Sequence, residues 1–315
     1  MVETPVEANC EALIIGAGPA GLTAAIYLAR FRRNLVLLDE GQSRARYIPV
    51  SRNCPGFAHG VSGVDLLAEL REQARRHGAL PAAAQVQSLQ RNGANFTADT
   101  GIRRIHAQRV VLATGLEDVL PNLPGVEAAV HCGVVRLCAV CDAYETKGRR
   151  VAVLAHAADL AKHARYLRSF SAEVCAISAD DSALPTQDAA ELAALGIECF
   201  STPESLTLKE QCVEMKLDGK RRQVDVLYPF LGARPRSALA AKLGARCNAE
   251  GYVVTDAHQR TTISGLYAAG DVASALNQIA VGVGHAAVAA AAIHNELAQR
   301  PLGDQSEIQQ SGVNR

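Results

Sequence analysis

Two cysteines three positions apart, with an acid directly after the second, are the residues of this 315-residue chain best suited to chemistry. They are Cys138 and Cys141, followed by Asp142. Such a pair can be half of a zinc site, a redox-active disulfide or a coincidence of spacing. A structural zinc ion needs four ligands, and the nearby His131 and Cys132 have the wrong spacing to supply them. The choice therefore depends on whether the chain also binds a redox cofactor.

A glycine-rich turn near the N-terminus is the second feature with chemical meaning. Residues 16–21, Gly-Ala-Gly-Pro-Ala-Gly, match the pattern G-x-G-x-x-G. Its first glycine permits a tight turn, its second lets a pyrophosphate approach the backbone, and its third lets a helix pack closely on a strand. The turn follows the apolar run 12–15 and opens a helical pattern. Asp39 ends the next apolar run, where an acid would hold ribose hydroxyls, so this context predicts a dinucleotide site.

Two distant segments indicate which dinucleotide this site binds. Residues 112–115 (LATG) and 265–272 (GLYAAGDV) resemble the later FAD signatures of flavoproteins with two dinucleotide-binding domains. The resemblance implies that Asp271 holds the ribityl–phosphate arm. It also implies that the next helix points its N-terminus at the isoalloxazine ring and stabilises negative charge there. FAD is therefore the expected cofactor. The residues expected to bind it are Gly16, Gly18, Pro19, Ala20, Gly21, Asp39, Glu40, Asn53, Ala113, Thr114, Gly115, Gly270, Asp271, Gln278 and Ile279.

With a flavin expected, the cysteine pair is predicted to be a redox-active disulfide rather than a metal site. The chain resembles the bacterial low-molecular-weight thioredoxin reductases over roughly residues 10–300, including the NCPGF motif at 53–57 and the CAVCD motif. The resemblance implies that Cys141 contacts the flavin, that Cys138 attacks a substrate disulfide and that Asp142 donates and accepts the proton. A thiolate is the nucleophile, so the chemistry needs an acid–base group beside the pair. The structural alternative for Asp142 is a helix cap.

The second strand-then-helix pattern of the chain departs from that family. Thioredoxin reductases carry a second glycine loop for NADPH here, whereas residues 154–161 read Leu-Ala-His-Ala-Ala-Asp-Leu-Ala. Ala155 and Ala157 place Cβ atoms where a pyrophosphate would approach, and Leu160 occupies the close-packing position. Residues 178–181, Ser-Ala-Asp-Asp, replace the family's basic cluster, and losing two charge-assisted hydrogen bonds costs about 3–6 kcal/mol. NADPH is therefore not expected to bind; a variant loop that still binds nucleotide is the alternative.

Without NADPH, another partner must exchange electrons with the flavin. NADPH-independent relatives offer three precedents: reduction by ferredoxin, oxidation of dithiols with electrons passed to oxygen, and a second FAD beside the first. We favour oxidation of an external dithiol by the flavin through the cysteine pair, with or without a second FAD, because no basic patch stands out for an acidic ferredoxin. The alternatives are a ferredoxin-dependent thioredoxin reductase, a conventional NADPH-dependent thioredoxin reductase and a non-catalytic flavin redox sensor. The expected thiol partner is a thioredoxin-like protein or a small dithiol.

These sites require two α/β units to position them. Residues 12–38 read strand, glycine turn, helix, strand, and the order strand, helix, strand returns over residues 150–177 without a glycine turn. We therefore predict an α/β fold of two Rossmann-like dinucleotide-binding domains, with the cysteine pair in the inserted one. Residues 1–117 and 250–315 are expected to build the FAD domain discontinuously. Residues 118–249 are expected to build the disulfide domain, entered through a Pro/Gly-rich linker.

Composition argues against several other functions. Lys+Arg and Asp+Glu both number 32, and aromatic residues make up 4% of the chain without any Trp, so nucleic-acid binding is not expected. The N-terminus lacks a signal-peptide pattern, and the longest apolar run, 279–293, is too short for a bilayer span. Nine cysteines without a regular framework fit a reducing cytosol. Membrane association is therefore not expected, and the family resemblance implies a homodimer.

Overall fold

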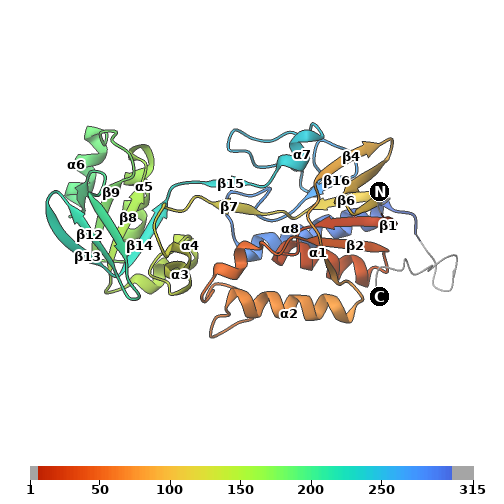
Figure 1. Cartoon of the computed structure of the whole chain (residues 1–315), viewed down its shortest axis with the longest axis horizontal. Helices are drawn as coiled ribbons and strands as arrows, with labels where there is room; N and C mark the ends of the chain where they lie inside the picture. The colour runs from red at the N-terminus through yellow and green to blue at the C-terminus, as the bar shows by residue number, and fades with distance from the viewer. Residues whose placement is uncertain (1–5, 300–315) are drawn as a thin grey trace. The chain divides into compact units, whose positions relative to one another are not determined.

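The computed structural model describes residues 6–299, which form two compact units (Figure 1). The first unit consists of the chain up to Ala45, Asp65–Glu117 and the chain from Pro235 onward. The second unit consists of Arg46–Val64 and Asp118–Arg234. The predicted α/β class, with a discontinuous first unit and the cysteine pair in the inserted one, is confirmed.

The boundaries of the units differ from the predicted ones in two places. The chain returns to the first unit at Pro235 rather than at residue 250, and residues 46–64 belong to the second unit. A hydrogen bond holds the segment after Pro235 to the first unit: Thr114 Oγ1 donates to the carbonyl oxygen of Arg236 at 2.7 Å. A hydrogen bond between segments far apart in the chain leaves no periodic signal in the sequence. The two connecting strands pair with each other: β7 (Leu116–Asp118) and β15 (Ala233–Pro235).

A seven-stranded sheet forms the core of the first unit, in the order β3-β2-β1-β6-β5-β4, with β16 also paired to β6. Strands β3, β2, β1, β6 and β16 run parallel to one another. The pairs β6–β5 and β5–β4 are antiparallel. Residues 12–14 of β1 are fully buried, as in a parallel strand covered on both faces. The strands are β1 (Val6–Ile15), β2 (Leu35–Asp39), β3 (Pro81–Ala83), β4 (Ser88–Asn92), β5 (Asn95–Asp99), β6 (Arg103–Leu112) and β16 (Leu266–Ala268).

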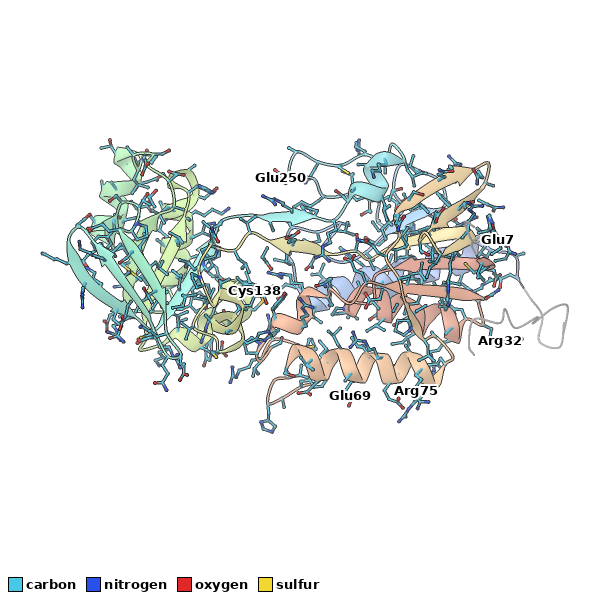
Figure 2. All side chains as sticks on the ribbon, in the orientation of Figure 1. Glu7, Arg32, Glu69, Arg75, Cys138 and Glu250 are labelled. Atoms are coloured by element: carbon cyan, nitrogen blue, oxygen red, sulfur yellow. A yellow bond between two sulfur atoms is a disulfide. The ribbon has the colours of Figure 1, made fainter. Side chains whose placement is uncertain are left out.

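Helices complete the first unit. They are α1 (Pro19–Arg30), α2 (Gly63–Arg76), α7 (Ala238–Lys242) and α8 (Ile279–Glu296). Charged side chains such as Glu69 and Arg75 project from α2 (Figure 2). The Ala-rich helix α8 packs against α1, and the buried Arg33 holds its C-terminal end. Arg33 forms an ion pair with Glu11 at 3.1 Å and donates to the carbonyl oxygen of His294 at 2.9 Å. These contacts fix the helix that follows the second FAD-like segment.

The second unit contains a four-stranded parallel sheet in the order β10-β9-β8-β14. Its strands are β8 (Arg150–Ala155), β9 (Glu173–Ser178), β10 (Glu198–Phe200) and β14 (Val226–Phe230), and its longer helices are α5 (Ala157–Arg168) and α6 (Thr186–Ala194). The order β8-α5-β9 is the second Rossmann-like pattern predicted from the sequence. An antiparallel sheet lies between β10 and β14 along the chain: β11 (Ser205–Leu208), β12 (Val213–Leu217) and β13 (Lys220–Val224).

Short helical segments precede this sheet and carry the cysteines. They are α3 (Val126–His131), α4 (Ala139–Asp142) and a 3-10 turn at Ala143–Thr146. Ala139 and Ala143 are buried in the same apolar cluster as β8, α5 and β14, which fixes the cysteine-bearing segment to the sheet. Within residues 6–299, no helix has both the length and the apolar character that a membrane span needs.

Candidate active site

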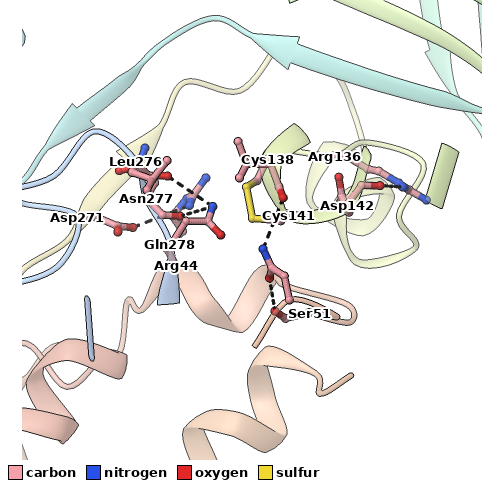
Figure 3. The surroundings of a disulfide bond; sticks show 12 residues. Arg44, Ser51, Arg136, Cys138, Cys141, Asp142, Asp271, Leu276, Asn277 and Gln278 are labelled. Carbon is pink, nitrogen blue, oxygen red and sulfur yellow. Dashed lines mark hydrogen bonds and ion pairs between the residues drawn. A yellow bond between two sulfur atoms is a disulfide. The ribbon is translucent and has the colours of Figure 1, made fainter. Parts of the chain in front are cut away.

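Cys138 and Cys141 form a disulfide at the start of α4 (Figures 2 and 3). Cys138 is the residue before the helix, and its carbonyl oxygen accepts a hydrogen bond from the Cys141 N–H at 3.0 Å. The single helical turn therefore brings the two sulfur atoms together. The predicted disulfide is confirmed, and a zinc half-site is not compatible with two sulfur atoms bonded to each other. Among residues 6–299, no group of three or more His, Cys, Asp or Glu side chains could hold a metal ion.

Asp142 lies next to this disulfide in a polar cluster that the sequence did not reveal. The Tyr228 hydroxyl donates to Asp142 Oδ1 at 2.6 Å. Arg136 Nη1 donates to the Asp142 carbonyl oxygen at 2.8 Å (Figure 3). Burial raises the pKa of the Asp142 carboxyl, while Tyr228 and Arg136 oppose that rise. In the described part of the chain, Asp142 makes no side-chain cap hydrogen bond, so the capping alternative finds no support.

A carboxylate of the same chain, that of Asp180, lies beside the N-terminus of α5. His156 precedes the helix, and its Nδ1 lies 2.8 Å from Asp180 Oδ2. The pKa of Asp180 is held below its ordinary value by His156 first, and then by the backbone N–H groups of Ser182 and Ala157. An anion at a helix N-terminus is favoured by the helix dipole and by unpaired N–H groups. Asp180 therefore places a negative charge beside the turn that precedes α5, near which a Rossmann unit binds the phosphates of a dinucleotide.

Bulky side chains surround the same end of the sheet. Phe230 ends β14, and His163 of α5 stacks on its ring with centroids 3.9 Å apart and planes 5° apart. Leu160 is buried at the position where a dinucleotide loop has a glycine, and Ala155 is fully buried at the end of β8. In doubly wound sheets, ligands bind outside the carboxyl ends of the strands. Here aromatic and aliphatic side chains lie at that end.

The glycine turn of the first unit has the geometry that a dinucleotide requires. Gly16 adopts a φ of 101°, and a Cβ at this position would overlap the carbonyl oxygen of Ala113. A Cβ at Gly21 would overlap the Gly16 carbonyl oxygen, so close packing of helix on strand needs this glycine. Gly18 is the residue before α1, with Pro19 and Ala20 in its first turn. The Ala17 N–H donates to Asp39 Oδ1 at 3.0 Å, which places the predicted ribose-binding acid beside the turn.

A cavity of about 470 Å³ lies next to this acid, within the usual size range of ligand pockets. Its lining residues are Asp39, Glu40, Gly41, Pro81, Ala83, Ala84 and Gln85. The sequence analysis identified Asp39 and Glu40 but missed residues 81–85. They reach the site because β3 pairs with β2 in a register that sets Ala83 opposite Asp39. A three-residue strand has too little periodicity to be predicted.

The other predicted cofactor residues of the first unit gather at the ends of β6 and β16. Ala113, Thr114 and Gly115 follow β6, and a Cβ at Gly270 would lie 2.9 Å from the Ala20 Cβ. Asp271 forms an ion pair with Arg44 at 3.8 Å, and Gln278 and Ile279 open α8 (Figure 3). The neighbouring Asn277 has a buried Oδ1 without a hydrogen-bond partner in residues 6–299, a position that a bound ligand could satisfy.

Asn53 is the exception among the predicted cofactor residues. It belongs to the second unit, where Ser51 Oγ donates to its Oδ1 at 3.1 Å. Its Nδ2 also donates to the carbonyl oxygen of Val140 at 3.5 Å, and Val140 lies between the two cysteines in the sequence. The structure thus groups Asn53 with the disulfide rather than with the glycine turn, and its role as an FAD ligand stays a prediction.

Comparisons with known proteins agree with this geometry. A model of the family described as pyridine nucleotide-disulphide oxidoreductase matches residues 11–292. The thioredoxin reductase of Treponema pallidum is 28% identical over 298 residues, which cover 90% of this chain and 96% of that protein. A structure titled "Crystal structure of HlmI" matches with a TM-score of 0.84 and 27% identity, covering 91% of this chain and 92% of that one. The thioredoxin reductase of Streptococcus pyogenes matches with a TM-score of 0.82 and 25% identity, covering 91% and 98%.

Proposed function

The chain belongs to the pyridine nucleotide-disulphide oxidoreductase family, and from this premise we propose that it moves electrons between an external dithiol, the Cys138–Cys141 pair and FAD without NADPH. Its identity as a thioredoxin reductase-like flavin disulfide oxidoreductase rests on the family and on the disulfide. The independence from NADPH and the favoured direction, oxidation of a dithiol, are the proposal. The names of its relatives suggest a thioredoxin-like protein as substrate, and a small dithiol fits the same chemistry.

The contact between His156 and Asp180 is the observation that carries this proposal. A nucleotide phosphate would have to approach the carboxylate of Asp180, which lies 2.8 Å from His156 beside the turn that precedes α5. It would also have to approach a turn without glycine, between two buried alanines, Ala155 and Ala157. The relatives' family name includes a pyridine nucleotide, so this is the property in which we propose that the chain differs from its family.

The residues present fit FAD in the first unit. The glycine turn, the N-terminus of α1, Asp39 and the adjacent cavity would hold the adenosine and pyrophosphate parts, and Asp271 with the start of α8 would hold the flavin part. Bound FAD supplies a two-electron acceptor and donor for the cysteine pair.

The chain's own residues account for the sulfur chemistry. In dithiol oxidation, a substrate thiolate attacks one sulfur of the pair, the Cys138–Cys141 bond breaks, and the electron pair stays on the other cysteine as a thiolate. The second substrate thiolate then attacks the mixed disulfide and releases the oxidised substrate, leaving both cysteines reduced. We assign Cys138 as the attacked sulfur. We assign Asp142 as the group that takes one proton at a time from the substrate thiols and passes it to the cysteine thiolates, so that both protons end on the reduced pair. The substrate has then lost two electrons, and the cysteine pair has gained them.

Other sequence-based expectations remain proposals. A second FAD, a ferredoxin partner and a homodimer gain no particular support from the contacts within residues 6–299. The flavin-to-protein ratio of desalted protein tests the second FAD, because a single site gives a ratio near one.

A dithiol oxidation assay tests the proposed function. Purified protein is mixed with dithiothreitol, and electron transfer is followed by oxygen consumption or by reduction of ferricyanide. We expect Cys138→Ser to lower the rate by about 10²-fold or more, because a lone thiol cannot form the intramolecular disulfide. Cys132→Ser is the matched control, since Cys132 is an exposed free cysteine of the same unit, and it should keep wild-type activity.

Two results of this assay would contradict the proposal. Full dithiol oxidation by Cys138→Ser would place the sulfur chemistry elsewhere in the chain. NADPH-driven reduction of a disulfide substrate at a rate above that of dithiol oxidation would restore the conventional activity of the family.

A further inference from the structure

Tyr228 is a fully buried tyrosine in the strand that lies under the cysteine-bearing segment. Its ring belongs to the apolar cluster that also contains Ala139 and Ala143, on either side of Cys141 and Asp142. An apolar side chain would fill the same space without a hydroxyl that needs a partner. Buried hydroxyls are retained where they are hydrogen-bonded, and this one donates to Asp142 Oδ1 at 2.6 Å.

Two charged residues, Arg136 and Glu145, and the disulfide are the other groups near this hydrogen bond. Arg136, between α3 and α4, donates to the Asp142 carbonyl oxygen at 2.8 Å and to the Gly133 carbonyl oxygen at 3.1 Å. Arg136 lowers the pKa of Asp142, whereas Glu145 in the following 3-10 turn raises it. Burial first, and then Asp142 itself, raises the pKa of Tyr228, so the phenol keeps its proton and stays a donor. The disulfide is the third neighbour, since Asp142 directly follows Cys141.

We infer that Tyr228 is a positioning residue that fixes the Asp142 carboxyl for proton transfer at the Cys138–Cys141 pair. Its hydrogen bond occupies Oδ1 and stabilises the ionised carboxylate, which leaves Oδ2 as the atom that accepts a proton. When a substrate thiol opens the disulfide, its sulfur bonds to one cysteine, the electron pair of the broken bond stays on the other, and its proton passes to Oδ2. This inference rests on the proposed function in one respect, the role of Asp142.

Opening of the disulfide by dithiothreitol at different pH values tests this role. The full-length protein is mixed with dithiothreitol, quenched with N-ethylmaleimide, and the alkylated Cys138 and Cys141 are quantified by mass spectrometry. Ratios of variant to wild-type rates at each pH cancel the ionisation of the reagent. A pH-dependent change in the rate of disulfide opening that the wild type shows and Asp142→Asn lacks is assigned to ionisation of Asp142. In Tyr228→Phe we expect its midpoint to rise by about 1 pH unit, because a hydrogen bond that favours the ionised carboxylate is lost.

Two control variants separate positioning from stability. Ser171→Ala removes another buried hydroxyl of the same unit, which donates to the Arg149 carbonyl oxygen at 2.6 Å, and should leave the midpoint unchanged. Tyr228→Phe combined with Asp142→Asn should have the same pH profile as Asp142→Asn alone.

Three results would overturn the inference. The first is an unchanged midpoint in Tyr228→Phe, even if the rate falls evenly at every pH. The second is an effect of Tyr228→Phe on the pH profile that persists in the double variant. The third is an Asp142→Asn profile identical to that of the wild type. Because alkylation reports the disulfide directly and requires no flavin turnover or nucleotide, reduction of the flavin by NADPH would refute the proposed function without affecting this test.

Discussion

At Asp142, function and stability make opposite demands. Burial raises the pKa of this carboxyl in the folded protein, whereas the unfolded chain ionises at the ordinary value. The stability that this group contributes is therefore fully present below the unfolded pKa and is lost as pH rises through the folded pKa. Above the folded pKa, the ionised acid in this position costs stability.

Asp142→Asn should accordingly stabilise the protein at neutral pH. Asn keeps an acceptor for the Tyr228 hydroxyl and removes the charge, so we expect the thermal midpoint to rise by about 2 °C. The gain should vanish below about pH 3, where the carboxyl is protonated in both the folded and the unfolded state. Scanning calorimetry of both proteins at the two pH values measures this, and an equal gain at both would show that the charge is not its cause.

Sequence reasoning identified some residues of this site and missed others for a physical reason. Cys138, Cys141 and Asp142 lie within five positions of one another, so the motif is visible in the sequence, and the flavin motifs and the family resemblance together indicate its chemistry. Tyr228 lies 86 positions from Asp142, in a strand that reads only as apolar. Its contact exists because β14 pairs with β8 in the sheet beneath α4, a long-range arrangement that no local pattern specifies.

At the scale of a single element, the N-terminus of α5 carries the proposed loss of a nucleotide site. In its Rossmann position, the N-terminus would bind a phosphate, yet here Asp180 accepts hydrogen bonds from the backbone and lies 2.8 Å from His156. The pKa of Asp180 is lowered by these partners. Stability from this acid is therefore present above the unfolded pKa and is lost as pH falls through the folded pKa.

Asp180→Asn should lower the thermal midpoint at neutral pH, because the amide carries no charge to interact with the helix dipole and His156. The loss should disappear in acid, where the wild-type carboxyl is also neutral. This pH dependence is opposite in sign to that of Asp142→Asn. The matched control is Asp181→Asn, whose acid accepts a hydrogen bond from Thr202 on the other side of the turn. If both substitutions lower the midpoint equally, the effect comes from the loop and not from α5.

Elements built from neighbouring residues were predictable, and elements built from distant ones were not. The sequence of β1, glycine turn, α1 and β2 follows from local periodicity and from glycines that sterics require at Gly16 and Gly21. Residues 81–85 line the cavity, and residues 235–249 belong to the first unit, through pairings with remote strands and loops. Such pairings depend on the assembled sheet rather than on the segment itself.

The whole molecule divides its chemistry between two units. The first holds the glycine turn, the cavity beside Asp39 and the start of α8, which fit FAD. The second holds the disulfide, Asp142 and a Rossmann-like α5 whose N-terminus binds Asp180. The family fold is thus retained while one of its two dinucleotide turns has changed. Under the proposed function, electrons enter from a thiol or from another donor, and not through a nicotinamide.

An anaerobic titration of the purified flavoprotein tests this central claim most directly. The flavin absorbance is recorded while NADPH, NADH and dithiothreitol are each added to separate samples, with Cys138→Ser as the control for the sulfur pathway. We predict that dithiothreitol bleaches the flavin of the wild type but not that of Cys138→Ser, and that stoichiometric NADPH or NADH leaves it oxidised. Rapid bleaching by micromolar NADPH would contradict the claim that the pyridine nucleotide site is lost.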